Sequence, residues 1–359
     1  MKVISNTIRF FFLLISFFAL YVIGAILYGM ATEHHFPDEL KLSEELDFVK
    51  AISDTTFEFI SWNIGYVGLG EESDFFYDGG EDVFTSKDLI QKNMDGVIDF
   101  IQNHSYVDFF LLQEVDSMSW RSNKLNFFQK IENSWQYNYA LNYASSFVPI
   151  PIFNPLGPVY GGLCSMTHFP VIDAFRYDLR TESAWPKRLF FLKRCFLTQR
   201  IPLLEKELIV INIHNSAYDK SGIKKNKEMQ HILNFAEREF DKGNYVVIGG
   251  DWNQSPPNYS NKAIPELYKN SAFTNDDVPQ DWKWVADVNT PTNRKLNMPY
   301  TRGVSYTSVI DHYLISPNVS VDSIAVVDMQ FKYSDHQPVY LKVTLDKGSY
   351  TTDEAKPAQ

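Results

Sequence analysis

The chain has 359 residues, of which 45% are hydrophobic and 21% charged, with 17 glycines and 17 prolines in no fixed period. This balance excludes a largely disordered or collagen-like chain, and two cysteines exclude a disulfide framework or a four-cysteine zinc module. The net charge of −11, from 33 basic and 44 acidic residues, argues against a protein held on nucleic acid by counterion release.

The N-terminal part of the chain predicts a membrane segment. Residues 1–9 carry basic residues and no acidic one, and residues 10–30 carry no charge at all. A helix over 10–30 is roughly 31 Å long at about 1.5 Å per residue, enough to cross a bilayer core. We favour an uncleaved single-pass anchor with residues 1–9 in the cytoplasm and the rest of the chain outside it. The alternatives are a cleaved signal peptide, which would give a secreted or periplasmic protein, and a buried core helix.

The rest of the chain predicts a connecting segment, one catalytic domain and a tail. Residues 32–54 are polar and charged and are expected to form a stalk. Residues 55–345 alternate between strand-like and helix-like patterns, which predicts an α/β domain. Residues 346–359 are expected to be a flexible tail.

Within the predicted domain, short runs rich in aromatic and β-branched residues indicate strands. Apolar residues at helical spacing predict helices over 86–103 and 221–242, the first with Ser86 as its N-cap. We expect irregular structure at 65–85, 142–160 and 254–308.

Polar residues gather at the ends of the predicted strands. They are Asn63, Glu114, His214, Asp251, Asn253, Asp311, Asp335 and His336. Ligand groups converge at strand ends in open α/β sheets. A cluster so rich in oxygen suits Mg²⁺, Mn²⁺ or Ca²⁺ better than a closed zinc site.

The order of these motifs, WN, QE, H, GDxN, ID and SDH, resembles that of the endonuclease/exonuclease/phosphatase superfamily. This superfamily includes deoxyribonucleases, sphingomyelinases and inositol polyphosphate 5-phosphatases. The resemblance covers most of residues 55–345 and implies a four-layer α/β sandwich, in which two packed mixed sheets are flanked by helices. The sequence departs from the family pattern at Trp252, where Phe is usual, and at 164–170, which lacks a basic residue often found there.

The resemblance also implies a role for each polar residue. It implies that the metal, Mg²⁺ or else Mn²⁺ or Ca²⁺, is bound by Asn63, Glu114 and Asp335. It implies that the catalytic residues are His214, Asp251, Asn253, Asp311 and His336. Asp311 is expected to orient His336, while His312 should face the opposite side of the same strand.

For several other residues and segments, the sequence is compatible with more than one role. Arg121 is assigned to substrate binding, because a guanidinium suits phosphate, and the alternative is a surface ion pair. Asp219 is expected to hold the loop after His214. Cys164 and Cys195 are expected to be buried free thiols rather than a disulfide. The apolar segment 147–160 is either a loop packed over the domain or a loop at the membrane or the substrate entrance.

The sequence therefore predicts a membrane-anchored, metal-dependent phosphodiesterase or phosphatase acting outside the cytoplasm. We expect a monomer that acts on a lipid headgroup or a small phosphoester and binds no nucleic acid tightly. A metal-dependent deoxyribonuclease is the alternative. An inactive binding protein is disfavoured by the intact set of acidic residues and histidines.

Overall fold

The computed structural model describes residues 2–43, 51–131, 135–217, 219, 222–257, 259 and 272–346. Two mixed β-sheets form the centre of the fold. The first has six strands in the order β14 (Val319–Val326), β15 (Val339–Leu345), β2 (Thr56–Asn63), β3 (Phe109–Asp116), β5 (Gly157–Thr167) and β4 (Gln136–Val148).

The second sheet has seven strands, in the order β1 (Glu39–Lys41), β6 (Asp173–Asp178), β7 (Cys195–Pro202), β8 (Glu207–His214), β9 (Tyr245–Asp251), β13 (Asp311–Ile315) and β10 (Lys283–Val285). A separate pair joins β11 (Asn293–Arg294) to β12 (Thr307–Ser308). In each large sheet one central pair is parallel, β2 with β3 and β8 with β9. The α-helices of the described residues are α1 (Lys2–Ala31), α2 (Lys87–Asn103) and α3 (Ile223–Asp241). Short 3₁₀ turns are η1 (Gly65–Val67), η2 (Phe76–Asp78), η3 (Phe127–Gln129), η4 (Lys187–Phe190) and η6 (Asn275–Asp277).

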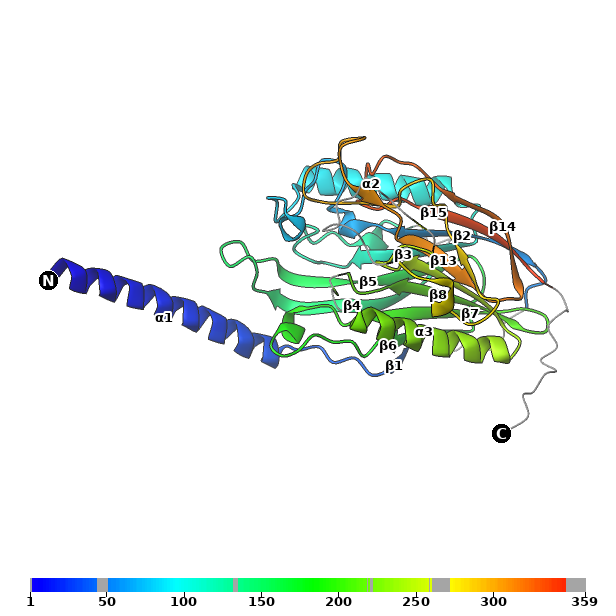
Figure 1. The fold of residues 1–359 in the computed structure, drawn as a ribbon, viewed down its shortest axis with the longest axis horizontal. Helices are drawn as coiled ribbons and strands as arrows, with labels where there is room; N and C mark the ends of the chain where they lie inside the picture. Colours follow the sequence, from blue (N-terminus) through cyan, green and yellow to red (C-terminus); the bar gives the residue numbers. More distant parts are fainter. Residues whose placement is uncertain are drawn as a thin grey trace.

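The two sheets pack face to face with one helix on each outer side, which confirms the predicted four-layer sandwich (Figure 1). The alternation of side chains along β2 explains the layering. Phe57 and Phe59 point between the sheets, and Ile60 and Trp62 point towards α2. Each strand therefore contributes to two apolar layers at once.

Both predicted helices are confirmed. Ser86 caps α2 by accepting a hydrogen bond from the backbone N–H of Leu89. The apolar face of α2 covers β2 and β3 through Ile90, Met94, Val97 and Ile101. Helix α3 covers the outer face of β8 and β9 in the same way, through Met229, Ile232, Leu233 and Ala236.

One expectation about an irregular segment is wrong, and the segment after α1 contains a strand. The stretch 142–160 is mostly a hairpin, because β4 runs to Val148 and β5 begins at Gly157. The expected stalk is partly folded onto the domain, since Glu39–Lys41 pairs with β6. In 142–160 four prolines concealed the hairpin, whereas the expected stalk is polar and concealed a short strand at the edge of its sheet. Residues 44–50 and 347–359, within the predicted stalk and tail, lie outside the described residues.

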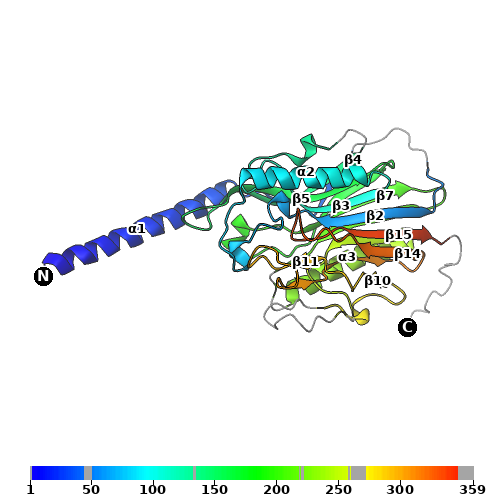
Figure 2. The same cartoon turned by 90° about the horizontal axis from the view of Figure 1, so that it is seen from above.

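Helix α1 projects from one end of the domain, as two perpendicular views show (Figures 1 and 2). Its segment Asn6–Ala31 is long and apolar enough to span a membrane, and none of its most apolar window is buried against the domain. A core helix would be covered, so the structure argues against that alternative. Length and composition do not separate an anchor from a signal peptide.

Candidate active site

The site forms where the strands of both sheets end. Alternation along β8 places Leu208 and Val210 between the sheets, and His214 continues the same face at the strand end. The register pairs Asp251 with both His214 and Asp311 on the neighbouring strands. Asn63 likewise continues the inner face of β2. The polar residues therefore lie together because they extend the inward faces of the sandwich beyond its apolar centre.

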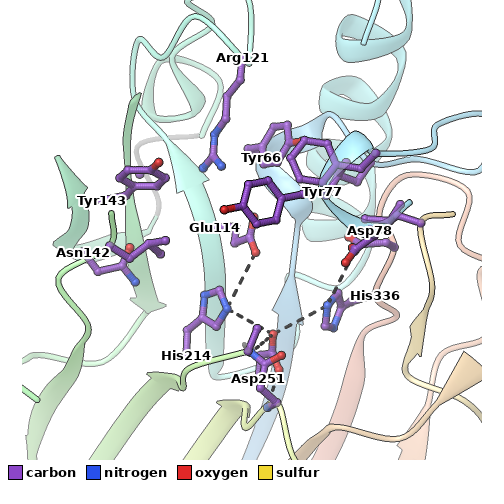
Figure 3. A pocket seen from close by; sticks show the side chains of 18 of the residues that line it. Tyr66, Tyr77, Asp78, Glu114, Arg121, Asn142, Tyr143, His214, Asp251 and His336 are labelled. Carbon is purple, nitrogen blue, oxygen red and sulfur yellow. Dashed lines mark hydrogen bonds and ion pairs between the residues drawn. The ribbon is translucent and has the colours of Figure 1, made fainter. Parts of the chain in front are cut away.

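A pocket of about 240 Å³ opens over this end of the sandwich. Most of the predicted site residues line it, namely Glu114, Arg121, His214, Asp251, Asn253, Asp335 and His336. Figure 3 shows Glu114, His214 and His336 around Asp251, with the rings of Tyr66, Tyr77 and Tyr143 further out. Asn63 and Asp311 are buried behind this layer and act on it through hydrogen bonds.

His336 is held between Asp311 and Asn293. Its Nδ1 lies 2.8 Å from Oδ2 of Asp311, and the Asn293 amide Nδ2 lies 3.0 Å from its Nε2. Burial disfavours the imidazolium, but the carboxylates of Asp311, Asp251 and Asp335 outweigh burial and raise the pKa of His336 well above its usual value. The predicted contact between Asp311 and His336 is present, and it fixes the imidazole ring.

His214 has the opposite electrostatic environment. Its Nε2 lies 3.4 Å from Oδ2 of Asp251 and 3.9 Å from Oε1 of Glu114. Burial, followed by the nearby charges of Arg194 and His336, lowers the pKa of His214 well below its usual value. The pKa values of the two histidines in this pocket are thus shifted in opposite directions.

Two carboxyl groups of the pocket hold their protons more tightly than exposed carboxyl groups do. Burial raises the pKa of Asp335 to about 7, with the charge of Glu114 adding to the effect and that of His336 opposing it. Burial raises the pKa of Asp251 to about 6, against the influence of His336. A bound cation would reverse these shifts, so the donor set fits a hard divalent ion that prefers oxygen ligands.

Asn63 orients this group. Its Nδ2 donates to Oε1 of Glu114 at 3.3 Å and to Oδ2 of Asp251 at 3.1 Å, while its Oδ1 accepts the N–H of Gly65 at 3.0 Å. The backbone donor fixes which end of the amide faces the acids. Gly65 has a φ of 50°, and a Cβ there would lie 2.8 Å from Oδ1 of Asp335, so this turn requires glycine.

Among the described residues, a second group of possible metal-ligand atoms lies close together. Single ligand atoms of Asp251, Asp311 and His336 lie within 4.8 Å of one another. Its members are already joined by the hydrogen bond between Asp311 and His336. Glu114 and Asp335 differ from this group because both line the open pocket.

Two site residues have a left-handed backbone. Glu114 and Asn253 both have a φ of 52°. The pairing of β3 with β5 slips between Leu112 and Val115, so Glu114 occupies a bulge. A bulge redirects a side chain away from the strict alternation of the strand. Such strain at a site persists only where the surroundings enforce it.

Arg121 makes an ion pair, but a buried one. Its Nε and Nη2 donate to the two carboxylate oxygens of Asp116 at 2.9 and 2.7 Å. The guanidinium carbon lies 4.0 Å from the ring centre of Tyr66 and 5.5 Å from that of Tyr143. Arg121 also lines the pocket, so its ion pair does not lie on the outer surface, and its guanidinium already has Asp116 as a partner.

Other expectations are resolved as follows. His312 faces away from the site, stacks on Trp252 and has Nε2 3.1 Å from the carbonyl of Gln254. Trp252 is fully buried, so the domain accommodates Trp at the position where Phe is usual in the family. Asp219, which follows His214 in the chain, accepts hydrogen bonds from the backbone N–H groups of Lys224 and Lys225 at the start of α3. Both cysteines are buried free thiols, as predicted.

Sequence reasoning missed Asn293 and the aromatic wall of the pocket. Asn293 falls in a stretch expected to be irregular, and no motif marks it. Tyr66 and Tyr143 come from η1 and β4, far apart in the chain. No local pattern predicts that such residues share a pocket, since only the packing of the two sheets brings them together.

The comparisons with known proteins agree with this geometry. The family model of the endonuclease/exonuclease/phosphatase family matches residues 60–336, which is most of the chain. The chain belongs to that family. No curated protein matches the chain by sequence.

Solved structures show the same fold at low identity. TDP2 from D. rerio, complexed with single strand DNA product, is 14% identical, with a TM-score of 0.52 over 81% of this chain and 100% of that one. An endonuclease/exonuclease/phosphatase from Beutenbergia cavernae is 14% identical, with a TM-score of 0.54 over 82% and 72% of the two chains. One from Bacteroides vulgatus is 15% identical, with a TM-score of 0.52 over 82% and 100%. At these identities the likeness concerns the fold.

Proposed function

We propose that this protein is a divalent-metal-dependent phosphoester hydrolase, anchored by α1 and acting on a phosphodiester or phosphomonoester outside the cytoplasm. The observation that carries the proposal is the pairing of two unlike histidines, His214 and His336, across one buried carboxylate, Asp251. Glu114 and Asp335 lie in the same pocket as a separate acidic pair. Together these groups match what the hydrolysis of an anionic ester needs.

Glu114 and Asp335 are the residues we assign to metal binding, with Mg²⁺ as the preferred ion and Mn²⁺ or Ca²⁺ as alternatives. Asn63, predicted as a ligand, is better suited to orienting Glu114 because its nitrogen faces the carboxylates. A divalent cation bound there supplies positive charge next to the phosphate. Hydrogen-bonded partners of metal ligands commonly tune the affinity of a site.

Asp251 is assigned as the base that removes the proton of the attacking water. Its Oδ2 lies 3.4 Å from Nε2 of His214 and 3.8 Å from Nε2 of His336, so the carboxylate faces the place between the two histidines where the phosphate and the attacking water would lie. The backbone N–H and Nδ2 of Asn253 donate to Asp251 at 2.9 and 3.3 Å, which fixes the carboxylate. His336, oriented by Asp311, presents Nε2 to a phosphate oxygen, and His214 presents its Nε2 from the other side.

A lipid headgroup or a small phosphoester is the favoured substrate. The pocket combines the charged floor with an apolar wall that includes Val148, Ile150, Leu156 and Phe191. Such a wall accepts hydrocarbon, whereas a nuclease needs basic surface along a strand. The net charge of −11 supports the same choice. Cleavage of DNA is the alternative that the assay below includes.

The test uses the full chain in detergent micelles. We expect Mg²⁺-dependent hydrolysis of a phospholipid in mixed micelles or of bis-p-nitrophenyl phosphate, and little cleavage of plasmid DNA. The His336→Ala variant should lose this activity. Full activity in excess chelator after dialysis, or an unaffected His336→Ala enzyme, would overturn the mechanism. Plasmid cleavage as the fastest reaction would favour the deoxyribonuclease alternative.

The anchor has its own test. The apolar and uncovered surface of α1 supports a membrane-spanning role. We expect the protein to remain in the membrane pellet after carbonate washing. A mature N-terminus near residue 32 would instead identify α1 as a cleaved signal peptide.

A further inference from the structure

Helix α1 is not loosely tethered to the domain. The Tyr21 hydroxyl donates to the carbonyl of Pro149 at 2.9 Å, and the Tyr28 ring meets Phe147 edge to face at 6.4 Å. Gly29 is buried, and a Cβ at this position would lie 2.8 Å from the ring of Phe190. The last turns of α1 therefore pack against the hairpin of β4 and β5 and against η4.

The segment after α1 is also fixed to the domain. Glu33 is almost fully buried and pairs with Lys193 at 3.0 Å and with Arg188 at 3.4 Å. The guanidinium of the buried Arg176 lies 3.9 Å from the ring centre of Phe36. Strand β1 then joins the edge of the seven-stranded sheet. The direction of α1 thus sets the orientation of the catalytic domain.

The tip of the hairpin is apolar and uncovered. Segment 147–160 contains no charged residue. Ile152 is 41% exposed and Phe153 is 101% exposed. The two perpendicular views place this loop at the end of the domain from which α1 leaves (Figures 1 and 2). Aromatic residues that anchor a protein at the membrane interface are found at positions of this kind, fully exposed and beside a membrane-spanning helix.

The same hairpin continues into the active-site pocket. Val148 and Leu156, at the base of the loop, belong to a buried apolar cluster, and Ile150 and Leu192 pack against it. These residues also line the pocket that holds Glu114 and His336. The base of the loop that carries Phe153 therefore forms part of the wall of the active-site pocket.

We propose that the loop 149–156 inserts into the bilayer that α1 spans, and that the pocket receives its phospholipid substrate directly from that bilayer. The proposal rests on the proposed function and names its substrate class. The contacts of Tyr21 and Tyr28 with the hairpin place the loop beside turns of α1 that are apolar on all sides. The bilayer that α1 spans covers that part of the helix, so the same bilayer lies next to the loop. The acyl chain follows the apolar wall, and the phosphate reaches His336.

The experiment labels single positions in the full chain reconstituted into phosphatidylcholine vesicles. Cys164 and Cys195 are fully buried, so an introduced thiol can be labelled selectively. Phe153→Cys carries an environment-sensitive dye, and lipids with doxyl groups on their acyl chains serve as quenchers. Leu204→Cys is the matched control, because Leu204 is 72% exposed in the turn between β7 and β8, at the opposite end of β8 from His214.

We expect strong quenching at position 153 and little at 204. In a second measurement, Phe153→Ser should lower the ratio of vesicle-phospholipid rate to soluble-phosphodiester rate about tenfold, whereas Leu204→Ser leaves that ratio unchanged. Equal quenching at both positions, an unchanged ratio for Phe153→Ser, or crosslinking of position 153 to a second protein copy would overturn the proposal. Loss of hydrolysis on every substrate in the unmodified protein would instead contradict the proposed function, while the quenching result would still stand.

Discussion

Nδ1 of His336 lies 2.8 Å from Oδ2 of Asp311, although Asp311 lies in one sheet of the sandwich and His336 in the connection that leads into the other. Asp311 begins β13 in the seven-stranded sheet, and His336 precedes β15 in the six-stranded sheet. The hydrogen bond thus joins the two sheets at the pocket. It also connects the orientation of the imidazole to the packing of the whole domain.

The Asp311→Asn substitution tests this contact. The amide keeps the shape but removes the negative charge that stabilises the His336 imidazolium. We expect kcat to fall by roughly 10²–10³, with the Mg²⁺ concentration for half-maximal activity nearly unchanged. His336→Ala should lower kcat by roughly 10²–10⁴. Steady-state kinetics over a range of Mg²⁺ concentrations separates the two effects.

His312 provides the control for these variants. It neighbours Asp311 but stacks on Trp252, away from the pocket. His312→Ala should destabilise the fold by roughly 2 kcal/mol or more, because it leaves a cavity. The folded fraction should keep a kcat within a few-fold of the unmodified protein. A catalytic loss as large as that of His336→Ala, in a folded protein, would show that Asp311 has been given the wrong role.

The metal assignment predicts distinct effects for a ligand and its orienting neighbour. Glu114→Gln removes a charged oxygen ligand, so we expect the Mg²⁺ requirement to rise at least about tenfold, with partial rescue at high Mg²⁺. Asn63→Ala should weaken Mg²⁺ binding by roughly 10–100-fold through the loss of orientation. Isothermal titration with Mg²⁺ measures both. Unchanged Mg²⁺ binding in Glu114→Gln would place the ion elsewhere, for example near Asp311 and His336.

The raised pKa values of Asp335 and Asp251 predict how Mg²⁺ stabilises the protein. With pKa values of about 7 and about 6, both groups bind protons more tightly folded than unfolded. Their contribution to the stability of the metal-free fold is therefore complete only below the usual carboxyl pKa of 3.8, and it is lost as the pH rises from there to about 6 for Asp251 and about 7 for Asp335. Mg²⁺ replaces those protons, so it should raise Tm more at pH 8 than at pH 5.5. Calorimetry with and without Mg²⁺ at both pH values tests this, and an equal rise at both would contradict it.

The sequence predicted the layers of the fold because the alternation of strands such as β2 and the spacing of α2 are local patterns. It predicted which polar residues lie together because those residues extend strand faces, and the motif order carried the family resemblance. It did not predict the position of Asn293, because that residue reaches His336 only through the long connection between β10 and β13. The bulge at Glu114 was equally hidden, since a slip in register depends on the partner strand.

The course of segment 142–160 was missed for a different reason. Its prolines argue against a central strand; three of them lie in the turn, but Pro158 is the second residue of the interior strand β5. The strands on either side are covered only in part, so their pattern is weak. The contacts of the turn with α1 could not be predicted at all, because they join an apolar helix to a loop more than a hundred residues later.

Arg121 is the residue whose role the sequence left open, and a single substitution distinguishes the alternatives. Its guanidinium bonds both oxygens of Asp116 while facing the pocket beside Tyr66. Arg121→Lys keeps the charge and loses the planar fork. If Arg121 binds the substrate phosphate, KM should rise roughly tenfold or more while Tm changes little.

Asp116 supplies the comparison that decides the matter. Asp116→Asn breaks the ion pair but leaves the guanidinium in place, and it leaves a buried charge without its partner. We therefore expect it to lower Tm more than Arg121→Lys does, with a smaller effect on KM. Equal losses of Tm in both variants, with KM unchanged in both, would assign Arg121 to holding the pocket wall. The measurements are thermal denaturation and substrate titration on the same preparations, so the stability and binding effects of each variant are read independently.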